Sequence, residues 1–450
     1  MNEFRSRWER LDLIRREKFD FSLPRALRDN GVSMWIHVMK HGNPDALAKD
    51  LGAGVDVLAP HPSHGSSCYF VFTDRGGERI ERAVLGGEVI RGNGGYDLFG
   101  GEEDLRTFVQ ERDPESIAVN MSGRIAVGDG LSYTGYARLG EALGEKYSAR
   151  LTSAEQVITD YRDRRVVAEI VEYGRLGETT RRLIERALSS EVITPGRTTL
   201  EEVAWWTKDE LLKLGVEPIF NKLFMPSVLY SAETEPEAYD SPDYAFQRGD
   251  LFQFDFGFDF MNHGSDIKRT AYVLPEGENA VPAGLQHAWD EGLRARGVLR
   301  ESIEVGRTTG ETVQVIARNM EEAGFVFVNL TGDPAFSGGW DEAWSAALEA
   351  RGGLGPGEEE KTQVSSDCHC VGNTGDSEVE AGPCISGFRP AVHHMVLKPN
   401  HIFAFELFAN TAIPEWGGTR IRLGIEDDAI LTDDGVQYFY PPNERILLIR

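Results

Sequence analysis

The sequence predicts a two-domain protein, with an α/β domain over residues 1–155 and an α+β domain over residues 156–450. The chain has 450 residues, which is more than one hydrophobic core usually organises. Up to about residue 150, short segments with helical spacing alternate with short apolar segments typical of strands. From about residue 151, long helical segments alternate with strand-rich stretches. This change of pattern places the domain boundary.

The first domain is predicted from a short series of elements. A helix over "SLPRALRDNG" ends at Gly31, and a buried strand over "VSMWIHVM" follows it. The segments "SCYFVFTD" and "SIAVN" predict further strands, and "GYARLGEALGEKY" has helical spacing. We identify no motif for catalysis or metal binding in this domain.

The second domain opens with two predicted helices, over residues 153–190 and 194–215. Thr198 and Glu201 have the spacing of a capping box at the start of the second helix. Gly215 is placed to cap its end.

Two more helices are predicted over residues 280–303 and 309–324, and strand-rich segments follow each helix pair. This order of elements suggests two similar halves. The segment 331–361 is rich in Gly and Glu, which predicts a loop or an insertion.

The composition excludes two classes of partner. The formal net charge is -26, whereas nucleic acids and anionic membranes bind basic surfaces. The first 20 residues are charged throughout and lack the apolar core of a signal peptide, and no apolar run has the length of a membrane span. Four cysteines in a chain of this length do not make a disulfide scaffold. These features predict a cytoplasmic protein.

One aspartate interrupts the alternating segment "FQFDFGFDF". Its phenylalanines, every second residue from Phe252 to Phe260, share one face of a strand, and Asp255 lies on the other face. A turn leads into a second strand that carries Asp266. The odd sequence difference places these two aspartates opposite each other in an antiparallel hairpin, with Cβ atoms roughly 5 Å apart. Such carboxylates repel, so the pair is either solvated or compensated by a metal ion.

Three later segments add candidate ligands. Glu406 is the lone acid in "HIFAFELFAN", Glu426 follows an Ile-Leu-Ile alternation in "RIRLGIEDDAIL", and His369 precedes a Gly-rich turn in "SSDCHCVGNTG". With the two aspartates they form an oxygen-rich set with one imidazole, which suits Mn²⁺, Co²⁺, Fe²⁺ or Zn²⁺ better than a thiolate site does. Five ligands, four of them carboxylates able to bridge, are enough for two ions roughly 3.5–4 Å apart.

These motifs resemble the metal signature of the pita-bread metallopeptidases (family M24), which include methionine aminopeptidase, aminopeptidase P, prolidase and creatinase. The five matching ligands, in order, are Asp255 in "FDFG", Asp266 in "SDIKRT", His369 in "CHCVG", Glu406 in "FAFE" and Glu426 in "GIEDDAILTDDG". The opening half is similar to the N-terminal domain of creatinase and prolidase, so the resemblance covers nearly the whole chain. It implies a creatinase-like N-terminal α/β domain followed by a pita-bread catalytic domain.

The resemblance also implies a function. It predicts a dinuclear metal-dependent hydrolase of the Xaa-Pro aminopeptidase or prolidase type, in which metal-bound hydroxide attacks an amide carbonyl and Glu406 shuttles the proton. The cofactor would be two divalent metal ions, with manganese as the first choice and cobalt, zinc or iron as alternatives. The substrate is expected to be a small peptide or a small polar amide, and the assembly a homodimer.

The sequence departs from the family at two histidines that handle substrate. The first lies upstream of the first aspartate in the family, but here no histidine lies between His64 and His263. The second follows the ligand histidine; here the segment is "GDSEVEAGP", with Glu380 as the expected occupant. His393 and His394 either take this role from another direction or are ordinary loop residues.

A third departure concerns an arginine that prolidase-like members carry two residues before the last glutamate. Gly424 stands at that position. Arg422 or Arg420 is expected to bind substrate in its place.

Two cysteines, Cys368 and Cys370, stand where the family has glycines around the ligand histidine. A Cys-His-Cys zinc site, a redox pair with Cys384, and plain packing are the three interpretations. The zinc site is disfavoured because adjacent residues of an extended segment point to opposite faces.

Loss of both substrate histidines removes groups that stabilise a tetrahedral intermediate and protonate the leaving amine. Two alternatives to a peptidase therefore stay open. One is a non-peptidase relative, either a creatinase-like C–N hydrolase or a metal-dependent lyase with Asp376, Glu378 or Glu380 as its base. The other is a non-catalytic metal-binding homologue.

Overall fold

The computed structural model describes residues 3–41, 43, 45–52, 67–86, 95–218, 224–232, 234, 241–331, 339–371, 373 and 381–450. The chain divides into two compact units, Met1–Glu172 with Gly372–Ala381, and Tyr173–Val371 with Gly382–Arg450. The boundary after Glu172 falls inside helix α7 (Val167–Ala187), whereas the sequence places it after residue 155.

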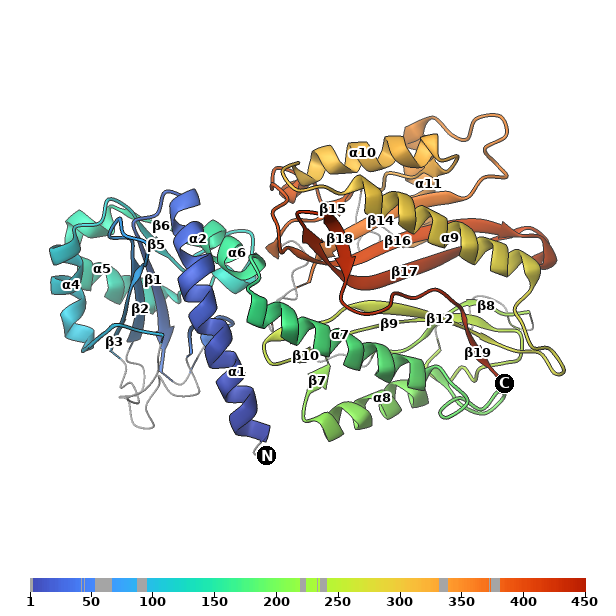
Figure 1. Cartoon of the computed structure of the whole chain (residues 1–450), viewed down its shortest axis with the longest axis horizontal. Coiled ribbons are helices and arrows are strands. Elements are labelled where there is room, and N and C mark those ends of the chain that lie inside the picture. Colours follow the sequence, from blue (N-terminus) through green and yellow to red (C-terminus); the bar gives the residue numbers. More distant parts are fainter. Residues whose placement is uncertain are drawn as a thin grey trace. The chain divides into compact units, whose positions relative to one another are not determined.

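The first unit is a mixed sheet with helices on both faces (Figure 1). Its strands, in the spatial order β4-β3-β2-β1-β5-β6, are β1 (Met34–Lys40), β2 (Ser67–Thr73), β3 (Glu81–Leu85), β4 (Leu98–Gly100), β5 (Ile117–Val119) and β6 (Leu151–Ser153). Its helices are α1 (Glu3–Glu17), α2 (Leu23–Asp29), α3 (Ala48–Leu51), α4 (Leu105–Arg112), α5 (Tyr133–Ser148) and α6 (Glu155–Asp163).

Alternation along the central strand β1 explains the two helix layers. Trp35 and Met39 point to one face, where they join a core with residues of α2 and α6. Ile36 and Val38 point to the other face, where they join a core with residues of α4 and α5. A strand buried on both faces is typical of an α/β domain, and the predicted class of this domain is confirmed.

The second unit contains two principal sheets, with strand orders β19-β12-β9-β8 and β13-β14-β16-β17-β18, and the small sheet β11-β10-β7. Its strands are β7 (Glu217–Pro218), β8 (Ser227–Tyr230), β9 (Leu251–Phe256), β10 (Phe258–Phe260), β11 (His263–Gly264), β12 (Ile267–Val273), β13 (Val326–Phe327), β14 (Gln363–Cys370), β15 (Ile385–Ser386), β16 (Ile402–Ile413), β17 (Thr419–Thr432), β18 (Gly435–Tyr438) and β19 (Leu447–Ile449). Its further helices are α8 (Leu200–Leu214), α9 (Ala283–Ser302), α10 (Thr309–Glu322) and α11 (Trp340–Arg351).

Each principal sheet buries its outer face under a helix pair (Figure 1). The phenylalanine face of β9 packs with residues of α7 and α8, as the alternation predicts. Phe403, Phe405 and Leu407 of β16 pack with residues of α9 and α10. The opposite, inner faces carry the polar residues, and β12 lies against β17 between the sheets. This arrangement confirms the predicted mixed fold.

Helices α9 and α10 lie close to their predicted bounds, whereas the helix predicted over residues 153–190 is divided into α6 and α7, and α8 starts at Leu200 and not at residue 194. The capping box of α8 is one residue later than predicted: Thr199, not Thr198, accepts from the Glu202 backbone, and the Glu202 carboxylate accepts from the Thr199 backbone. Gly215 caps the end with φ 67°, as predicted. The segment 331–361 is not only a loop, since it includes α11.

The hairpin register differs from the prediction by two residues. Asp255 pairs with Lys268, not with Asp266. The cause is the turn, which consists of Met261 and Asn262, both with positive φ as a type I′ turn requires. A pairing of Asp255 with Asp266 would need a turn centred one residue earlier. Because the error is an even number of residues, Asp266 still lies on the same face as Asp255, as its diagonal neighbour.

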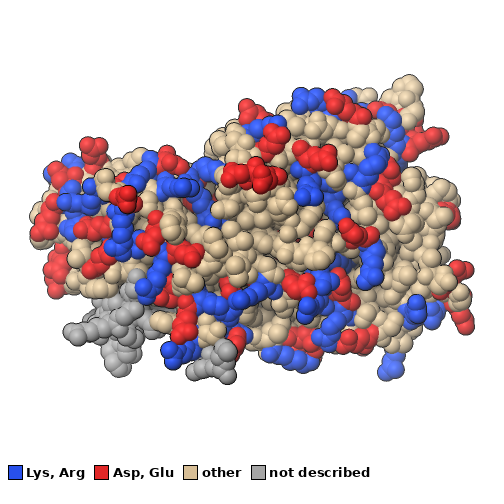
Figure 2. All heavy atoms as spheres, in the orientation of Figure 1, with Lys and Arg blue, Asp and Glu red and all other residues tan. Residues whose placement is uncertain are grey.

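Positive and negative side chains are interspersed on the face seen in Figure 2, as is typical of a solvated surface. Among the described residues, no helix has both the length and the apolar character that crossing a bilayer requires.

Candidate metal centre

The five predicted ligands converge between the two principal sheets of the second unit. Asp255 lies on β9, and Asp266 directly precedes β12. His369, Glu406 and Glu426 lie on β14, β16 and β17. Glu406 and Glu426 are directly opposite each other in the antiparallel register. The strands thus bring together residues that are up to 171 positions apart (426 − 255).

The imidazole of His369 faces three of these carboxylates. Its Nε2 atom lies 3.8 Å from Asp266 Oδ2, 4.0 Å from Glu406 Oε2 and 3.8 Å from Glu426 Oε1. Its Nδ1 atom lies 3.2 Å from the carbonyl oxygen of Cys370. A hydrogen bond from Nδ1–H to that carbonyl leaves the Nε2 lone pair directed at the carboxylates, which is how metal-bound histidines are usually held.

Burial and mutual repulsion disfavour the charged forms of the acids. Burial, followed by the charge of Glu426, raises the pKa values of Asp266 and Glu406 well above their usual range. Burial raises the pKa of Glu426 to about 7, although Lys268 opposes this. Burial lowers the pKa of His369. A divalent cation would remove this electrostatic cost.

The donor atoms fit such a cation. One candidate set is Asp266, His369 and Glu426, whose ligand atoms all lie within 4.8 Å of one another. The Oε1 atom of Glu426 is buried without a hydrogen-bond partner, which is costly for a carboxylate unless a cation binds it. Carboxylates with one neutral imidazole are ligands that suit first-row divalent ions.

Lys268, which the sequence motifs do not predict as a site residue, contributes a positive charge to this pocket. Its Nζ atom lies 3.0 Å from Asp255, 2.5 Å from Glu406 and 2.6 Å from Glu426. Burial favours the neutral amine, but these three carboxylates outweigh it and raise the pKa of Lys268 well above its usual range. A signal was present, because Lys268 follows Asp266 by two residues and therefore shares its face.

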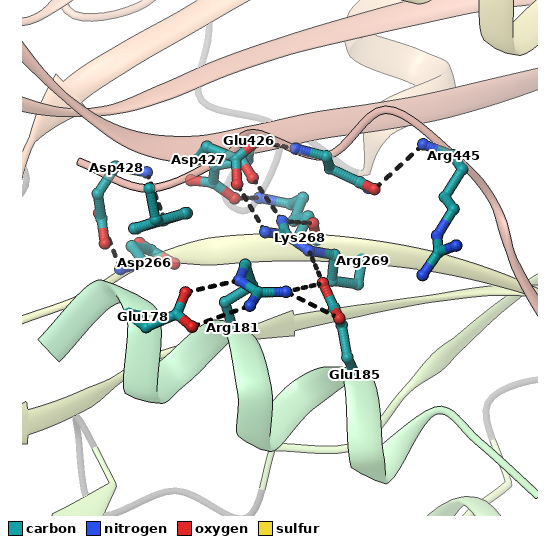
Figure 3. A network of polar contacts seen from close by, with 12 residues as sticks. Glu178, Arg181, Glu185, Asp266, Lys268, Arg269, Glu426, Asp427, Asp428 and Arg445 are labelled. Carbon is teal, nitrogen blue, oxygen red and sulfur yellow. Dashed lines mark hydrogen bonds and ion pairs between the residues drawn. The ribbon is translucent and has the colours of Figure 1, made fainter. Parts of the chain in front are cut away.

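A buried network fixes β12 against β17 (Figure 3). Arg269 donates to Asp427 at 2.7 Å and to the backbone carbonyl of Glu426 at 3.2 Å. The backbone amide of Asp266 donates to Asp428 at 3.2 Å. These bonds set the position of Asp266 relative to Glu426, and they use the two acids that follow Glu426 in the sequence.

A buried ion pair near His369 was also not predicted from the sequence. Arg389 donates to both oxygens of Asp367, at 2.9 and 2.8 Å, and both residues are buried. Burial alone would raise the pKa of Asp367, but the hydrogen bonds from Arg389 hold it below its usual value. Asp367 also lies near His369 and Glu406, but its oxygens are engaged by the guanidinium.

Replacing Arg389 with Met is expected to lower the free energy of unfolding by about 3–5 kcal/mol, because it leaves Asp367 buried without its partner. Denaturant unfolding measures this. The control is Arg182→Met, which removes an exposed pair with Glu178 on α7 and should cost about 1 kcal/mol or less. Equal effects of the two substitutions would contradict the structural role of Arg389.

A cavity of about 680 Å³ opens onto the carboxylates. Trp340 and Phe408 supply apolar surface to it. Arg422 also lines it, with its guanidinium over the Trp340 ring at 5.1 Å and paired with Asp341 at 2.8 Å. The start of α11 thus contributes to the cavity, a role that the sequence analysis did not predict for residues 331–361.

The other predicted site residues lie elsewhere or cannot be placed. Arg420 donates to the backbone carbonyls of Asn410, Glu359 and Lys361 and does not line the cavity. His393 donates to the carbonyl of Ser386 at 2.8 Å, and His394 is exposed; neither lines the cavity. The predictions for Asp376, Glu378 and Glu380, and for most of the segment that replaces the upstream histidine, fall outside the described residues.

All four cysteines are buried, and none of them forms a disulfide. Cys368 packs in the core with residues of α9 and α10, on the face opposite His369, and its thiol lies 3.7 Å from the carbonyl of Glu406. The candidate metal-binding groups among the described residues contain no cysteine.

Comparisons with known proteins agree with this geometry. The model of metallopeptidase family M24 matches residues 173–433, more than half of the chain. The comparison with curated proteins gave no match.

Solved structures of similar fold cover nearly the whole chain. The X-Pro aminopeptidase from Thermotoga maritima MSB8 has 16% identity and a TM-score of 0.58, over 94% of this chain and 99% of its own. Dipeptidase PepE from Mycobacterium ulcerans has 14% identity and a TM-score of 0.55, over 97% and 98%. The Xaa-Pro dipeptidase from Bacillus anthracis has 16% identity and a TM-score of 0.52, over 98% and 99%. At these identities the likeness establishes the fold alone.

Proposed function

The chain belongs to metallopeptidase family M24, and from this premise we propose that it is a metal-dependent hydrolase that cleaves an amide bond in a small peptide or a small polar amide. The observation that carries the proposal is the convergence of four carboxylates and one imidazole beside a cavity of about 680 Å³. That volume suits a small substrate.

The residues of the chain have separable roles in this proposal. Asp266, His369, Glu406 and Glu426 would hold a divalent ion, which when bound lowers the pKa of water and polarises a carbonyl. Glu406 is buried beside the same ligands. Its carboxylate is the group proposed to take a proton from the attacking water and pass it to the leaving amine.

Cavity residues indicate the class of substrate. Arg422 offers a guanidinium, which binds carboxylates in a bidentate manner, and Trp340 and Phe408 offer apolar surface. This combination supports a short peptide with a free carboxylate. Activity of the Xaa-Pro aminopeptidase or prolidase type is the finer form of the proposal, and the fold shared with an X-Pro aminopeptidase and an Xaa-Pro dipeptidase supports it.

A second candidate is a creatinase-like C–N hydrolase acting on a substrate with an amine or guanidine group. Asp341 and Glu342 also line the cavity, and acidic side chains favour a cationic substrate. The two family histidines missing from the sequence favour this candidate as well.

A substrate panel distinguishes the two candidates. Both candidates predict that the manganese-loaded protein releases amine from at least one small amide; the second predicts a lower kcat/KM for Ala-Pro than for amides that carry a side-chain amine or guanidine group. The physical reason is the missing hydrogen-bond donor to the oxyanion, worth roughly 3–4 kcal/mol. Efficient cleavage of Ala-Pro would favour the prolidase form, and no amine release from any member would contradict a hydrolase.

The homodimer follows from the family resemblance and the cytoplasmic location from the sequence features, and both are proposals of the same kind. A homodimer in the cytoplasm is expected. Light scattering at micromolar concentration should report twice the mass of the chain, and the mass of one chain would contradict the dimer.

A further inference from the structure

We propose that the ammonium group of Lys268 takes the place of a second metal ion, so that this centre binds one divalent ion per chain. The inference rests on the proposed metal-dependent function and concerns its cofactor. It departs from the two ions that the sequence motifs predict.

The first argument is the coordination of the ammonium group. Its Nζ atom lies within 3.0 Å of carboxylates from three different strands: Asp255 of β9, Glu406 of β16 and Glu426 of β17. A lysine ammonium has three N–H donors; here it donates to Glu426 at 2.6 Å and forms ion pairs with Asp255 and Glu406. A metal ion and this ammonium cannot occupy the same position between the same oxygens.

The second argument is that two glutamates divide their oxygens between two positions. Glu406 directs Oε1 to Lys268 and Oε2 towards His369. Glu426 directs Oε2 to Lys268 and Oε1 towards His369. Carboxylates that bridge two ions have this arrangement, and here one of the two positions is taken by the ammonium. The other position, which includes Asp266 and His369, keeps ligand atoms that all lie within 4.8 Å of one another.

The third argument is that the surrounding residues make room for the lysine. A Cβ atom at Gly424 would lie 3.0 Å from Lys268 Cδ and 2.8 Å from Gln253 Nε2. The backbone amide of Gly424 donates to Gln253 at 2.9 Å. Glycine at this position therefore accommodates the lysine side chain, which crosses the inner face towards the carboxylates.

The fourth argument is the balance of charge. Four carboxylates, from Asp255, Asp266, Glu406 and Glu426, face the two cation positions. One divalent ion and the ammonium supply three positive charges, whereas two divalent ions and the ammonium would supply five. The excess positive charge and the short separation would expel one of the cations.

The test is the number of Mn²⁺ ions bound by the metal-stripped full-length protein, measured by calorimetric titration and by electron paramagnetic resonance. The wild type should bind one ion and give the six-line spectrum of isolated Mn²⁺. Lys268→Ala and Lys268→Met should bind two ions with a spin-coupled spectrum. Lys213→Ala, which changes an exposed lysine on α8, is the matched control and should bind one ion.

Asp255→Asn gives an independent readout. Asp255 contacts the ammonium and not the His369 position, so this variant should still bind one ion. Two coupled ions in the wild type, or one ion in both folded Lys268 variants, would overturn the inference without affecting the proposed function. A wild type that binds no ion would contradict both.

Discussion

Replacing Asp266 with Ala is expected to abolish metal binding and amide hydrolysis together. Asp266 supplies the carboxylate whose Oδ2 atom faces His369 Nε2, and it belongs to the candidate set with Glu426. The ion contributes several kcal/mol of transition-state stabilisation, and each 1.36 kcal/mol is tenfold in rate. The expected loss in kcat/KM is therefore on the order of 10³-fold or more. Metal analysis and rate measurement on the same sample check both parts.

Asp433→Ala is the matched control for this substitution. Asp433 is an exposed acid in the turn after β17. Its removal changes the net charge of the protein by the same amount as Asp266→Ala but leaves the metal centre unchanged. Its metal content and rate should equal those of the wild type. Unchanged metal content in Asp266→Ala would contradict the ligand assignment.

Replacing Glu406 with Gln is expected to lower kcat by roughly 10²–10⁴-fold, the range of general acid–base catalysis. Gln has nearly the same shape and can still offer an oxygen to a metal, but it cannot carry a proton between water and the leaving amine. The substitution also removes one of the three carboxylates around Lys268. Assays with saturating Mn²⁺ separate the loss of proton transfer from weaker metal binding.

A lower kcat at saturating substrate, with the metal still bound, would support the proton-transfer role of Glu406. If Glu406→Gln lost its metal but recovered the wild-type kcat at high Mn²⁺, Glu406 would be a ligand only.

The sequence predicts much of this centre because the relevant signals are local. Alternation along a strand places Phe252, Phe254 and Phe256 on one face and Asp255 on the other, and the structure has this arrangement. Glu406 and Glu426, each an acid in an apolar segment, are local signals of the same kind. Glu406 and Glu426 lie opposite each other across β16 and β17. This pairing depends on the turn and the register of the two strands, which the family resemblance implies.

The features of the site that the sequence did not predict depend on details that the alternation of apolar and polar residues does not specify. The hairpin register follows from a turn at Met261 and Asn262, whereas the predicted pairing of Asp255 with Asp266 would need a turn centred one residue earlier. Because of this error, the role of Lys268 was not predicted, since it depends on the pairing of Lys268 with Asp255. The pair of Asp367 and Arg389 joins residues from different segments, and no local spacing connects them.

Amine release by the chelator-treated full-length protein, measured as Mn²⁺ is added stepwise, tests the central claim most directly. The substrate is the amide from the panel that the manganese-loaded protein cleaves fastest. We predict no release before addition, a rate that rises with Mn²⁺, and a plateau near one ion per chain. Release by the chelated protein at a rate that added Mn²⁺ does not change would contradict a metal-dependent hydrolase.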